Sequence, residues 1–372
     1  MKNDFASLRK AQSLSLSFLG FAGLVLSLPG VALAESQSSA NVCPSPAIEV
    51  SSDRLVPVTK KNYAKAETSD ILKDYVQKIA KHECNKGMGA FMHKKSAMDP
   101  ADRTILRANF DTLYSFVVLD LATPASIVLP EIDRYQILEV VSDEHWIPLV
   151  SDKSGRYELT QQFVGSRYAF VIVRTQVNMQ DSSDLAAAGT AQEMIGLQQE
   201  RPGQFTVDGQ YDRDEILELR AEYNQRREPE GITSDMIFGG KGEITSEMRN
   251  FGVAIGWGGL PKEGAVYPMP KIVPSTQPQQ LMLENVPMDA GSFWSVTVYD
   301  GKGFATGKHY NVNSAFAVKN ADGQYVINLG GSDTQNNYLN IFPGWSAVVR
   351  IYSPTQAYFD GIWSVPQFQP KQ

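Results

Sequence analysis

The sequence predicts a mainly β protein of the α+β class, with a short helical N-terminal part and two antiparallel β-sandwich, jelly-roll-like units separated by a helical insert. Three observations predict this fold. Short apolar segments of period two follow one another from residue 113 to 175 without helical spacing between them. A second set of such segments lies between residues 280 and 353. Residues 181–260, between the two sets, carry helical spacing and helix-capping residues instead.

Residues 1–34 have the features of a signal peptide. Lys2, Arg9 and Lys10 precede an apolar, serine-containing segment at 14–28, and the Ala32–Ala34 segment fits the small-x-small cleavage pattern. The predicted location is therefore periplasmic or secreted. No later run reaches the roughly 18 apolar residues of a membrane-spanning helix, so no transmembrane segment is expected after cleavage.

The charge balance excludes some classes of partner. The formal net charge is −7, and it falls to −9 without residues 1–34, because that segment holds three basic residues and one acidic residue. An acidic chain without a basic stripe is not expected to bind nucleic acid or anionic lipid. The partners left are a small molecule or an envelope ligand, and a homo-oligomer stays open.

The two cysteines, Cys43 and Cys84, lie close to the predicted mature N-terminus. In an oxidising compartment they are candidates for a disulfide, and two free thiols are the alternative. Neither belongs to a CxxC motif or a Cys/His cluster, so the cysteines do not indicate a zinc site.

The first half is expected to contain a flexible arm, a helix and a sandwich. Residues 35–64 are rich in Ser and polar residues, and form the arm. Ser69 is the expected N-cap of a helix that ends near His82, within a unit at 65–180. The expected strands of that unit are 113–121, 126–130, 135–141, 146–150, 156–159 and 168–175.

The second half is expected to contain the helical insert at 181–260 and a second sandwich at 261–372. Within the insert, helices are expected at 181–200, 212–227 and 246–254, the second opened by a capping box of Asp212 and Glu215. A Pro-rich linker at 269–278 leads into the second sandwich. Its expected strands are 280–286, 293–299, 325–329 and 347–353, with hairpin signals at Asp300-Gly301 and Asp322-Gly323.

Several ordered motifs resemble a two-part family of bacterial exported proteins. RANFDTLYSFVVLDL (107–121), the VLP that follows, HWIPLV (145–150) and GSRYAFVIVRT (165–175) resemble domain of unknown function 1254. GSFWSVTVYDGKGF (291–304), NADGQYVINLGG (320–331), PGWSAVVRIYSP (343–354) and DGIW (360–363) resemble its usual partner, domain of unknown function 1214.

The resemblance implies a fold more than an activity. It implies a helical N-terminal part, two jelly-roll-like sandwiches and export. The family has no settled activity, and some members carry hydrolase or carboxylesterase names. Close relatives have a cysteine pair around the segment that corresponds to 330–345, and this chain has no cysteine there.

Common catalytic and cofactor motifs are absent from the sequence. It has no Gly-x-Ser-x-Gly elbow and no His-Glu-x-x-His motif. The glycine-rich segment 301–307 misses the nucleotide-loop spacings and belongs to a predicted hairpin. No cofactor is predicted, and the four scattered histidines leave a divalent metal open without specifying its ligands.

The first candidate site is the polar cluster at the start of the 113–121 strand. On an extended chain, Arg107, Asn109 and Asp111 would share one face. In a ligand site, Arg107 would hold an anion, Asn109 and Asp111 would bind hydroxyls, and Tyr114 would stack or donate. The alternative is a buried network that ties the strand to the helical part, because buried charges need partners.

The second and third candidates are an acidic cluster and an aromatic residue. In Asp143-Glu144-His145-Trp146, the acids and the histidine suit general acid/base catalysis or a divalent cation. His145, Asp111 and Glu144 are the catalytic candidates, and Trp146 joins the ligand-binding candidates. Trp257, among glycines, could stack on a ligand or pack at an interface. A solvated loop with Trp146 entering the core is the alternative for the cluster.

Three hypotheses of function follow. The leading hypothesis is a protein that binds a small molecule or envelope component at the junction of the two sandwiches. The second is an exported hydrolase, esterase-like or metal-assisted, that uses the acids and His145. The third is a structural or oligomeric envelope protein whose sheet edges pair between chains.

Overall fold

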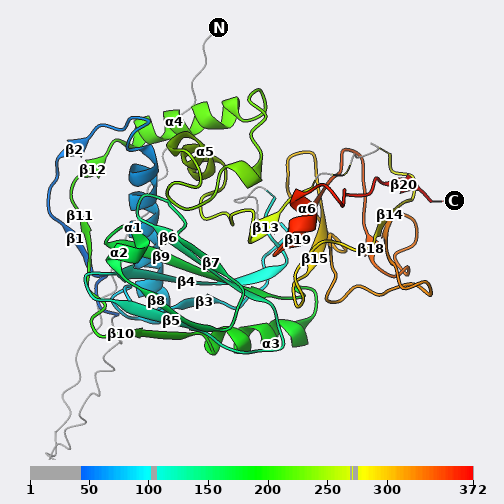
Figure 1. The fold of residues 1–372 in the computed structure, drawn as a ribbon, viewed down its shortest axis with the longest axis horizontal. Coiled ribbons are helices and arrows are strands. Elements are labelled where there is room, and N and C mark those ends of the chain that lie inside the picture. The colour runs from blue at the N-terminus through cyan, green and yellow to red at the C-terminus, as the bar shows by residue number, and fades with distance from the viewer. Residues whose placement is uncertain (1–42, 102–106, 269, 271–274, 372) are drawn as a thin grey trace, which may run out of the picture. The chain divides into compact units, whose positions relative to one another are not determined.

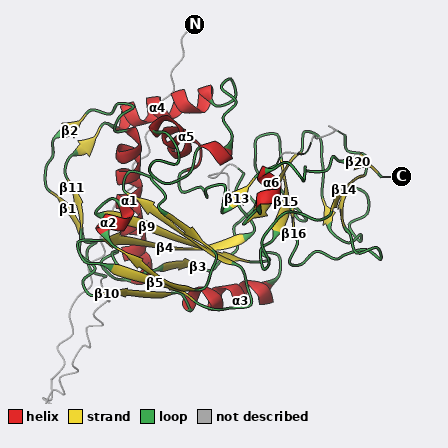
Figure 2. Cartoon of the chain, in the orientation of Figure 1, coloured by secondary structure: helices red, strands yellow, loops and turns green. Residues whose placement is uncertain are grey.

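The computed structural model describes residues 43–101, 107–268, 270 and 275–371 (Figure 1). The predicted signal peptide at 1–34 and half of the 269–278 linker lie outside the described residues. The predicted α+β, mainly β class is confirmed. Helices α1 to α5 all precede residue 257, and the only helix assigned after it in the described residues is the four-residue α6 (Gln356–Phe359) (Figure 2).

The arm pairs with the middle of the chain. β1 (Ile48–Val50) runs parallel to β11 (Phe205–Val207), and β2 (Leu55–Val56) runs parallel to β12 (Gln210–Tyr211). Gly209, in the turn between β11 and β12, has a φ of +152°, and a Cβ there would lie 2.7 Å from Val56 Cγ2. The close approach of β2 therefore requires glycine at this position.

Helix α1 (Tyr63–Glu83) begins six residues before the expected start, so the prediction of Ser69 as N-cap is wrong. The first turns contain Tyr63, Ala64 and Ala66, which are fully buried. Because these residues are buried against the rest of the molecule, the helix begins before the apolar pattern from which its start was predicted. Ser69 is half-buried within the helix.

The predicted first sandwich is two facing antiparallel sheets. One has the order β3 (Met92–Lys94), β4 (Thr112–Asp120), β9 (Tyr168–Gln176), β6 (Gln136–Ser142) and β7 (Leu149–Ser151). The other has the order β10 (Gly196–Gln199), β5 (Ala125–Leu129) and β8 (Gly155–Leu159). The strand expected at 146–150 is shorter and later, because residues 143–145 form a turn.

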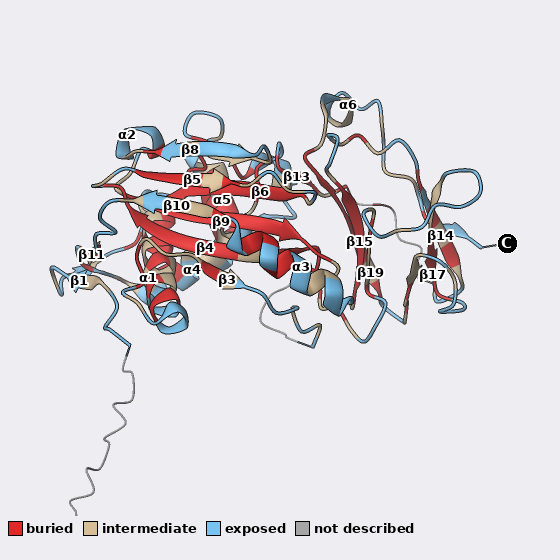
Figure 3. Ribbon diagram, turned by 90° about the horizontal axis from the view of Figure 1, so that it is seen from below, coloured by how far each residue is buried: buried red, intermediate tan, exposed pale blue. Residues whose placement is uncertain are grey.

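Both faces of the five-stranded sheet are covered. Val117, Val140 and Val171 face the smaller sheet, whereas Phe116 and Phe170 face α1. The central strands are accordingly buried along their whole length, unlike the outer strand β8 (Figure 3). A strand buried on both faces reads as a continuous apolar run, as the sequence of β9 does.

Helix α2 (Gln161–Val164) lies between β8 and β9, before the insert. The insert itself contains α3 (Ser182–Glu193), α4 (Arg213–Arg226), a 3-10 turn at Ser234–Met236 and α5 (Ser246–Gly256). The helix expected to reach residue 200 ends at 193, because the next residues pair as β10 with β5. Asp212 caps α4 as predicted, but Glu215 accepts from Val58 N instead of Asp212 N. Glu215, the second residue of the predicted capping box, therefore binds the arm and not the first turn of α4.

The second sandwich also consists of two sheets. One sheet has the order β13 (Ala265–Val266), β19 (Ser346–Tyr352), β15 (Trp294–Tyr299) and β16 (Asn311–Asn313). The other sheet has the order β18 (Tyr338–Leu339), β17 (Tyr325–Leu329), β14 (Gln279–Leu283) and β20 (Gln369–Pro370). Trp294 lies in their common core, as predicted. Asp300-Gly301 lies in the β15–β16 hairpin, whereas Asp322-Gly323 turns the chain between strands of different sheets, so that hairpin prediction is wrong.

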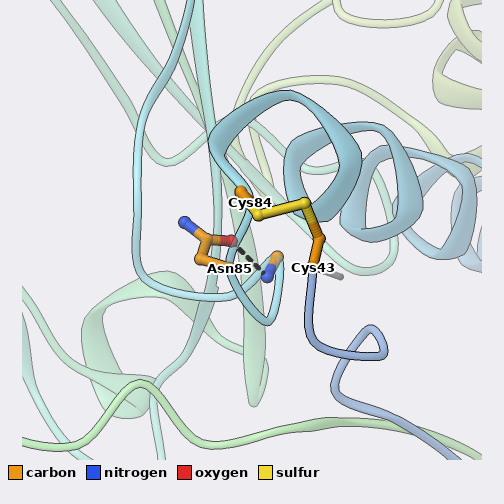
Figure 4. The surroundings of a disulfide bond; sticks show 4 residues. Cys43, Cys84 and Asn85 are labelled. Atoms are coloured by element: carbon orange, nitrogen blue, oxygen red, sulfur yellow. Dashed lines mark hydrogen bonds between the residues drawn. A yellow bond between two sulfur atoms is a disulfide. The ribbon is translucent and has the colours of Figure 1, made fainter. Parts of the chain in front are cut away.

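Cys43 and Cys84 form the predicted disulfide, which joins the arm to the residue after α1 (Figure 4). Cys84 has a left-handed backbone, with a φ of 50°, and its N–H caps the helix on Ala80 O. Asn85 Oδ1 accepts from Gly87 N at 2.6 Å in the adjoining turn. The arm is thus tied at its first described residue and again by its two strand pairings.

Replacing both cysteines, Cys43→Ser with Cys84→Ser, should lower the free energy of unfolding by about 3–4 kcal/mol. The bond closes a loop with a sequence separation of 41, and its loss frees that loop in the unfolded chain. Urea unfolding with and without reductant measures the effect. Reductant should destabilise the wild type to the level of the variant and leave the variant unchanged, and equal stability of all four samples would contradict the prediction.

Candidate functional site

The segment before β4 does not continue the strand. β4 begins at Thr112, and Arg107 has a left-handed backbone with a φ of 51°. The alternation that placed Arg107, Asn109 and Asp111 on one face therefore does not apply. Arg107 is exposed, whereas Asp111 is fully buried, so the two side chains have different environments.

Asp111 joins the two sandwiches. Its carboxylate accepts from Ser295 Oγ at 2.6 Å, Asn311 Nδ2 at 2.8 Å and Tyr352 OH at 3.1 Å. These donors belong to β15, β16 and β19 of the second sandwich. A buried carboxylate needs such donors to offset its loss of solvation. The structure therefore shows the network that the sequence left as an alternative, but its partners are in the second sandwich and not in the helical part.

Arg350, on β19, forms the second layer of this network. It donates to Thr297 Oγ1 at 3.0 Å, to the backbone O of Arg107 at 3.0 Å and to Tyr299 OH at 2.7 Å. Tyr299 OH donates in turn to Ala108 O at 2.7 Å. The guanidinium thus fixes the backbone of the 107–108 segment, while the side chain of Arg107 stays at the surface.

Two small apolar clusters surround the polar network. One combines Ala108 and Phe110 with Tyr299, Tyr310 and Val348, and the other combines Tyr135 and Ile137 with Leu260, Phe293 and Tyr352. Each contains residues from both sandwiches. The buried hydrogen bonds therefore lie in an environment with little water, where unpaired charges are costly.

Asn109 and Tyr114 belong to a neighbouring polar group on β4. Asn109 Nδ2 donates to Thr112 Oγ1 and to Tyr114 OH, at 3.1 and 3.2 Å. The Tyr114 ring lies 5.5 Å from the guanidinium of Arg174, which pairs with Glu139 at 2.7 Å. Burial raises the pKa of Glu139, against the effect of Arg174. Tyr114 and Asn109 are half-buried, so together with the exposed Arg107 they are the members of the predicted cluster that solvent reaches.

The Asp143–Trp146 segment lies at the other end of the five-stranded sheet. Thr112 pairs with Gln176 at one end of β9, and Ser142 pairs with Ala169 at the other, which separates the two candidate sites by roughly 20 Å. Asp111 and His145 therefore do not converge.

His145 is a buried, structural side chain in this arrangement. Its Nε2 accepts from Gly258 N at 3.0 Å, and its φ is 63°. Burial lowers the pKa of His145 to about 3, with a further contribution from Arg249. The imidazole is therefore neutral near pH 7, and it fixes the glycine-rich turn after α5.

The other members of the segment have separate contacts. Glu144 is exposed and lies 3.7 Å from Arg249, whose guanidinium lies 4.4 Å from the centre of the buried Trp146 ring. Trp257 donates from Nε1 to Thr68 Oγ1 at 3.0 Å and packs on Phe170. Trp146 and Trp257 therefore have packing partners within the protein. Among the described residues, no group of three or more His, Cys, Asp or Glu side chains is arranged to hold a metal ion.

A groove lies at the junction beside the Asp111 network. Its volume is about 480 Å³, and both sandwiches line it. Residues of the β5–β6 loop, including Arg134 and Tyr135, form one wall together with Asp152 and Lys153 from the β7–β8 turn. Ala290, Gly291 and Ala315 of the second sandwich form the other. We call this cavity the junction groove.

Tyr135, Ser353 and Asp152 form a hydrogen-bonded chain at this groove. Ser353 Oγ donates to Asp152 Oδ2 at 2.8 Å, and the Tyr135 hydroxyl lies 2.8 Å from Ser353 Oγ. Ser353 has a left-handed backbone with a φ of 44°. Sequence reasoning missed this chain, since Tyr135 and Ser353 are 218 residues apart. The positive φ of a serine cannot be read from residue type, so no pattern signalled it.

Comparison with family models places two matches on the chain. Residues 88–145 match the model described as protein of unknown function DUF1254, and residues 278–356 match the model described as protein of unknown function DUF1214. The chain therefore contains both parts of the two-part family. The Asp111 network connects these two parts. A search of curated proteins finds no significant match.

One solved structure shares the fold. The VPA0106 protein from Vibrio parahaemolyticus has a TM-score of 0.60 and 15% sequence identity, over 84% of this chain and all of that chain. An uncharacterized protein from Burkholderia cenocepacia has a TM-score of 0.41 and 11% identity, over 83% of this chain and 88% of that chain. The first similarity shows the fold alone. No helix among the described residues has the length and apolar character needed to cross a membrane.

Asp111→Asn should destabilise the protein by about 3 kcal/mol or more. The amide cannot accept from three donors as the carboxylate does, and buried Arg350 loses a nearby anion. Urea unfolding measures the loss, and Asp333→Asn, at an exposed position, is the matched control. A variant as stable as the control would show that Asp111 is not the structural link between the sandwiches.

The stability of the protein should fall between about pH 6.5 and pH 3 partly through His145. The pKa of His145 is depressed in the folded state, so the unfolded chain binds this proton first and stability decreases as the pH falls. At pH 5 the cost is about 2 kcal/mol relative to pH 7. The difference in unfolding free energy between these pH values should shrink in His145→Gln and stay unchanged in His82→Gln, an exposed control. An undiminished difference would exclude His145 as its source.

Proposed function

We propose that this chain is an exported binding protein that holds a small, polar, neutral or cationic organic molecule in the junction groove. The observation that carries the proposal is a cavity of about 480 Å³ with walls from both sandwiches. This volume is within the range of small-molecule sites, which favour the boundary between domains.

The charges of the groove support this ligand class. Glu131, Asp133 and Asp152 line it against two cations, Arg134 and Lys153. Arg134 donates to both carboxylate oxygens of Asp184, at 3.1 and 2.5 Å, so its charge is already balanced. An acidic groove favours a cation or a hydroxylated neutral ligand over an anion.

Neutral polar groups in the groove support the same class. Gln136 lines it, and its Nε2 donates to Thr175 Oγ1 at 2.9 Å, which fixes this amide in the wall. The hydroxyl of Tyr135 and the amide of Gln176 add further hydrogen-bonding groups to the lining.

The disulfide supports the proposed periplasmic or secreted location. Cys43 and Cys84 are bonded in the structure, and such bonds persist in oxidising compartments. The N-terminal 34 residues have the composition of a signal peptide. Export is tested by cell fractionation, with sequencing of the mature N-terminus expected to begin at Glu35.

A thermal-shift panel of amines, sugars and organic acids tests the binding proposal. Amines or sugars should raise Tm, because a ligand at 100 times its Kd stabilises the folded state by about 2.7 kcal/mol. The organic acids should have no effect through this groove. The double variant Glu131→Gln with Asp133→Asn should weaken binding of an amine several-fold at low salt, because both carboxylates are exposed at the groove.

Asp322→Asn with Asp333→Asn is the matched control, since it removes the same charge from exposed positions elsewhere. Unchanged binding in the groove variant would place the ligand elsewhere. A panel without any stabilising amine or sugar would overturn the proposal.

The Tyr135–Ser353–Asp152 chain favours one second candidate, an exported esterase-like hydrolase. Ser353 Oγ donates to a carboxylate and lies on a left-handed backbone, as a strained nucleophile does. Turnover of ester substrates that Ser353→Ala abolishes would replace the binding proposal with this one.

A further inference from the structure

A second cavity lies at the opposite end of the first sandwich from the junction groove. Its volume is about 300 Å³, and it lies between the arm, α1 and the β11–β12 turn. Arg54 and Val56 of the arm line one wall, Lys65 and Ser69 of α1 another, and Asp143 and Arg167 reach it from the five-stranded sheet. We call this cavity the arm pocket.

Aromatic side chains provide its apolar surface. Tyr168 and Phe205 both line the pocket, and their ring centres lie 4.8 Å apart. The Tyr168 hydroxyl accepts from Thr206 N at 2.9 Å, which fixes the orientation of its ring. The two side chains are only 7% and 2% exposed, and the Arg167 guanidinium lies 5.0 Å from the centre of the Tyr168 ring, so the cavity meets the ring edges and this guanidinium.

The polar lining contains both cations and carboxylates. Arg54, Lys65 and Arg167 face two carboxylates, Asp143 and Asp208. Lys65 pairs with Asp143 at 2.5 Å. Asp208 Oδ1 accepts from Ser51 Oγ at 2.9 Å. Arg167 is paired with Asp120 outside the lining, so the pocket is distinguished by Arg54, an arginine without an ion pair among the described residues, and not by a net positive charge.

Arg167 and Arg54 differ in whether a carboxylate balances their positive charge. Arg167 donates from Nε and Nη2 to Asp120, which holds the guanidinium rigidly at 2.9 and 2.8 Å. Arg54 is exposed and forms no ion pair with any residue that the structure describes. Arg54 is therefore the cation available to a bound anion, with Arg167 held beside the aromatic surface.

We propose that the arm pocket binds a small organic anion, a carboxylate or a phosphate carried on a flat ring, with the anion on Arg54 and the ring beside the Arg167 guanidinium and the edges of Tyr168 and Phe205. Guanidinium groups suit both anions, because their donors match two oxygens at once. This site is independent of the junction groove, where the lining is acidic.

The arm completes this pocket. Arg54 and Val56 lie on a segment held by the β2–β12 pairing and by the Cys43–Cys84 bond. A ligand that contacts Arg54 would therefore bind better when the arm is tethered. This link provides a readout that binding at the junction groove does not share.

Titration calorimetry with benzoate and phenyl phosphate tests the proposal on the full mature chain. At least one of these probes should bind, and the tighter one identifies the anion class. Benzyl alcohol tests the ring without the anion, and acetate and inorganic phosphate test the anion without the ring. All three should bind more weakly than the better ring anion, and benzyl alcohol binding as tightly would overturn the proposal.

Two pairs of variants locate the binding. Arg54→Gln should raise Kd of the better probe about tenfold, and Arg227→Gln, at an exposed arginine elsewhere, should not. Ser69→Leu should abolish binding by filling the pocket from α1 with a good helix former, whereas Ser69→Ala should preserve it. Circular dichroism confirms that each variant is folded.

Two further outcomes separate this site from the junction groove. The Cys43→Ser, Cys84→Ser variant should bind the anion more weakly than wild type. Glu131→Gln with Asp133→Asn should leave anion binding unchanged. Binding that persists in Ser69→Leu, or that is lost in the groove variant, would overturn the assignment to the arm pocket.

Discussion

The burial of the Asp111 carboxylate is the constraint on which the arrangement of the two sandwiches depends. A fully buried anion is tolerated only where donors surround it, and all three side-chain donors to Asp111 come from the second sandwich. Separation of the sandwiches would expose or orphan this group, and would also remove the Arg350 contacts to residues 107 and 108. The polar network therefore selects one orientation of the junction, while the apolar clusters around it bury side chains from both sandwiches.

This constraint gives a physical meaning to the polar signature at 107–114. Asp111, Ala108 and the backbone of Arg107 contact the second sandwich, and Thr112 begins the strand. Asp111, in the part that matches DUF1254, thus depends on the part that matches DUF1214, because its donors are Ser295, Asn311 and Tyr352. A junction held in this way leaves the neighbouring groove with fixed walls, as a preorganised binding site needs.

The sequence predicted the strands well and the sites poorly, for different physical reasons. Period-two and apolar runs mark β4, β6 and β9 because burial on sheet faces controls the choice of residue along a strand. Asp212 was recognised because capping depends on adjacent residues. The Tyr135–Ser353 and Asp111–Tyr352 contacts connect residues more than 200 positions apart, and no local pattern records them. The left-handed backbones of Arg107 and His145 also broke the assumed alternation, because neither residue type signals a positive φ.

The junction groove and the arm pocket differ in the charged residues that line them. This difference follows from the segments that form their walls. The junction groove is lined by Glu131 and Asp133, which are exposed, and by Asp152, which accepts from Ser353 and pairs with Lys153. The arm pocket lies where the arm returns to the sheet, and there Arg167 and Lys65 are needed to pair with the buried Asp120 and Asp143. Those pairs concentrate cations at the pocket while balancing the buried acids. Arg54 adds a charge that pairs with no such acid, and its exposed guanidinium is accessible to solvent at the pocket.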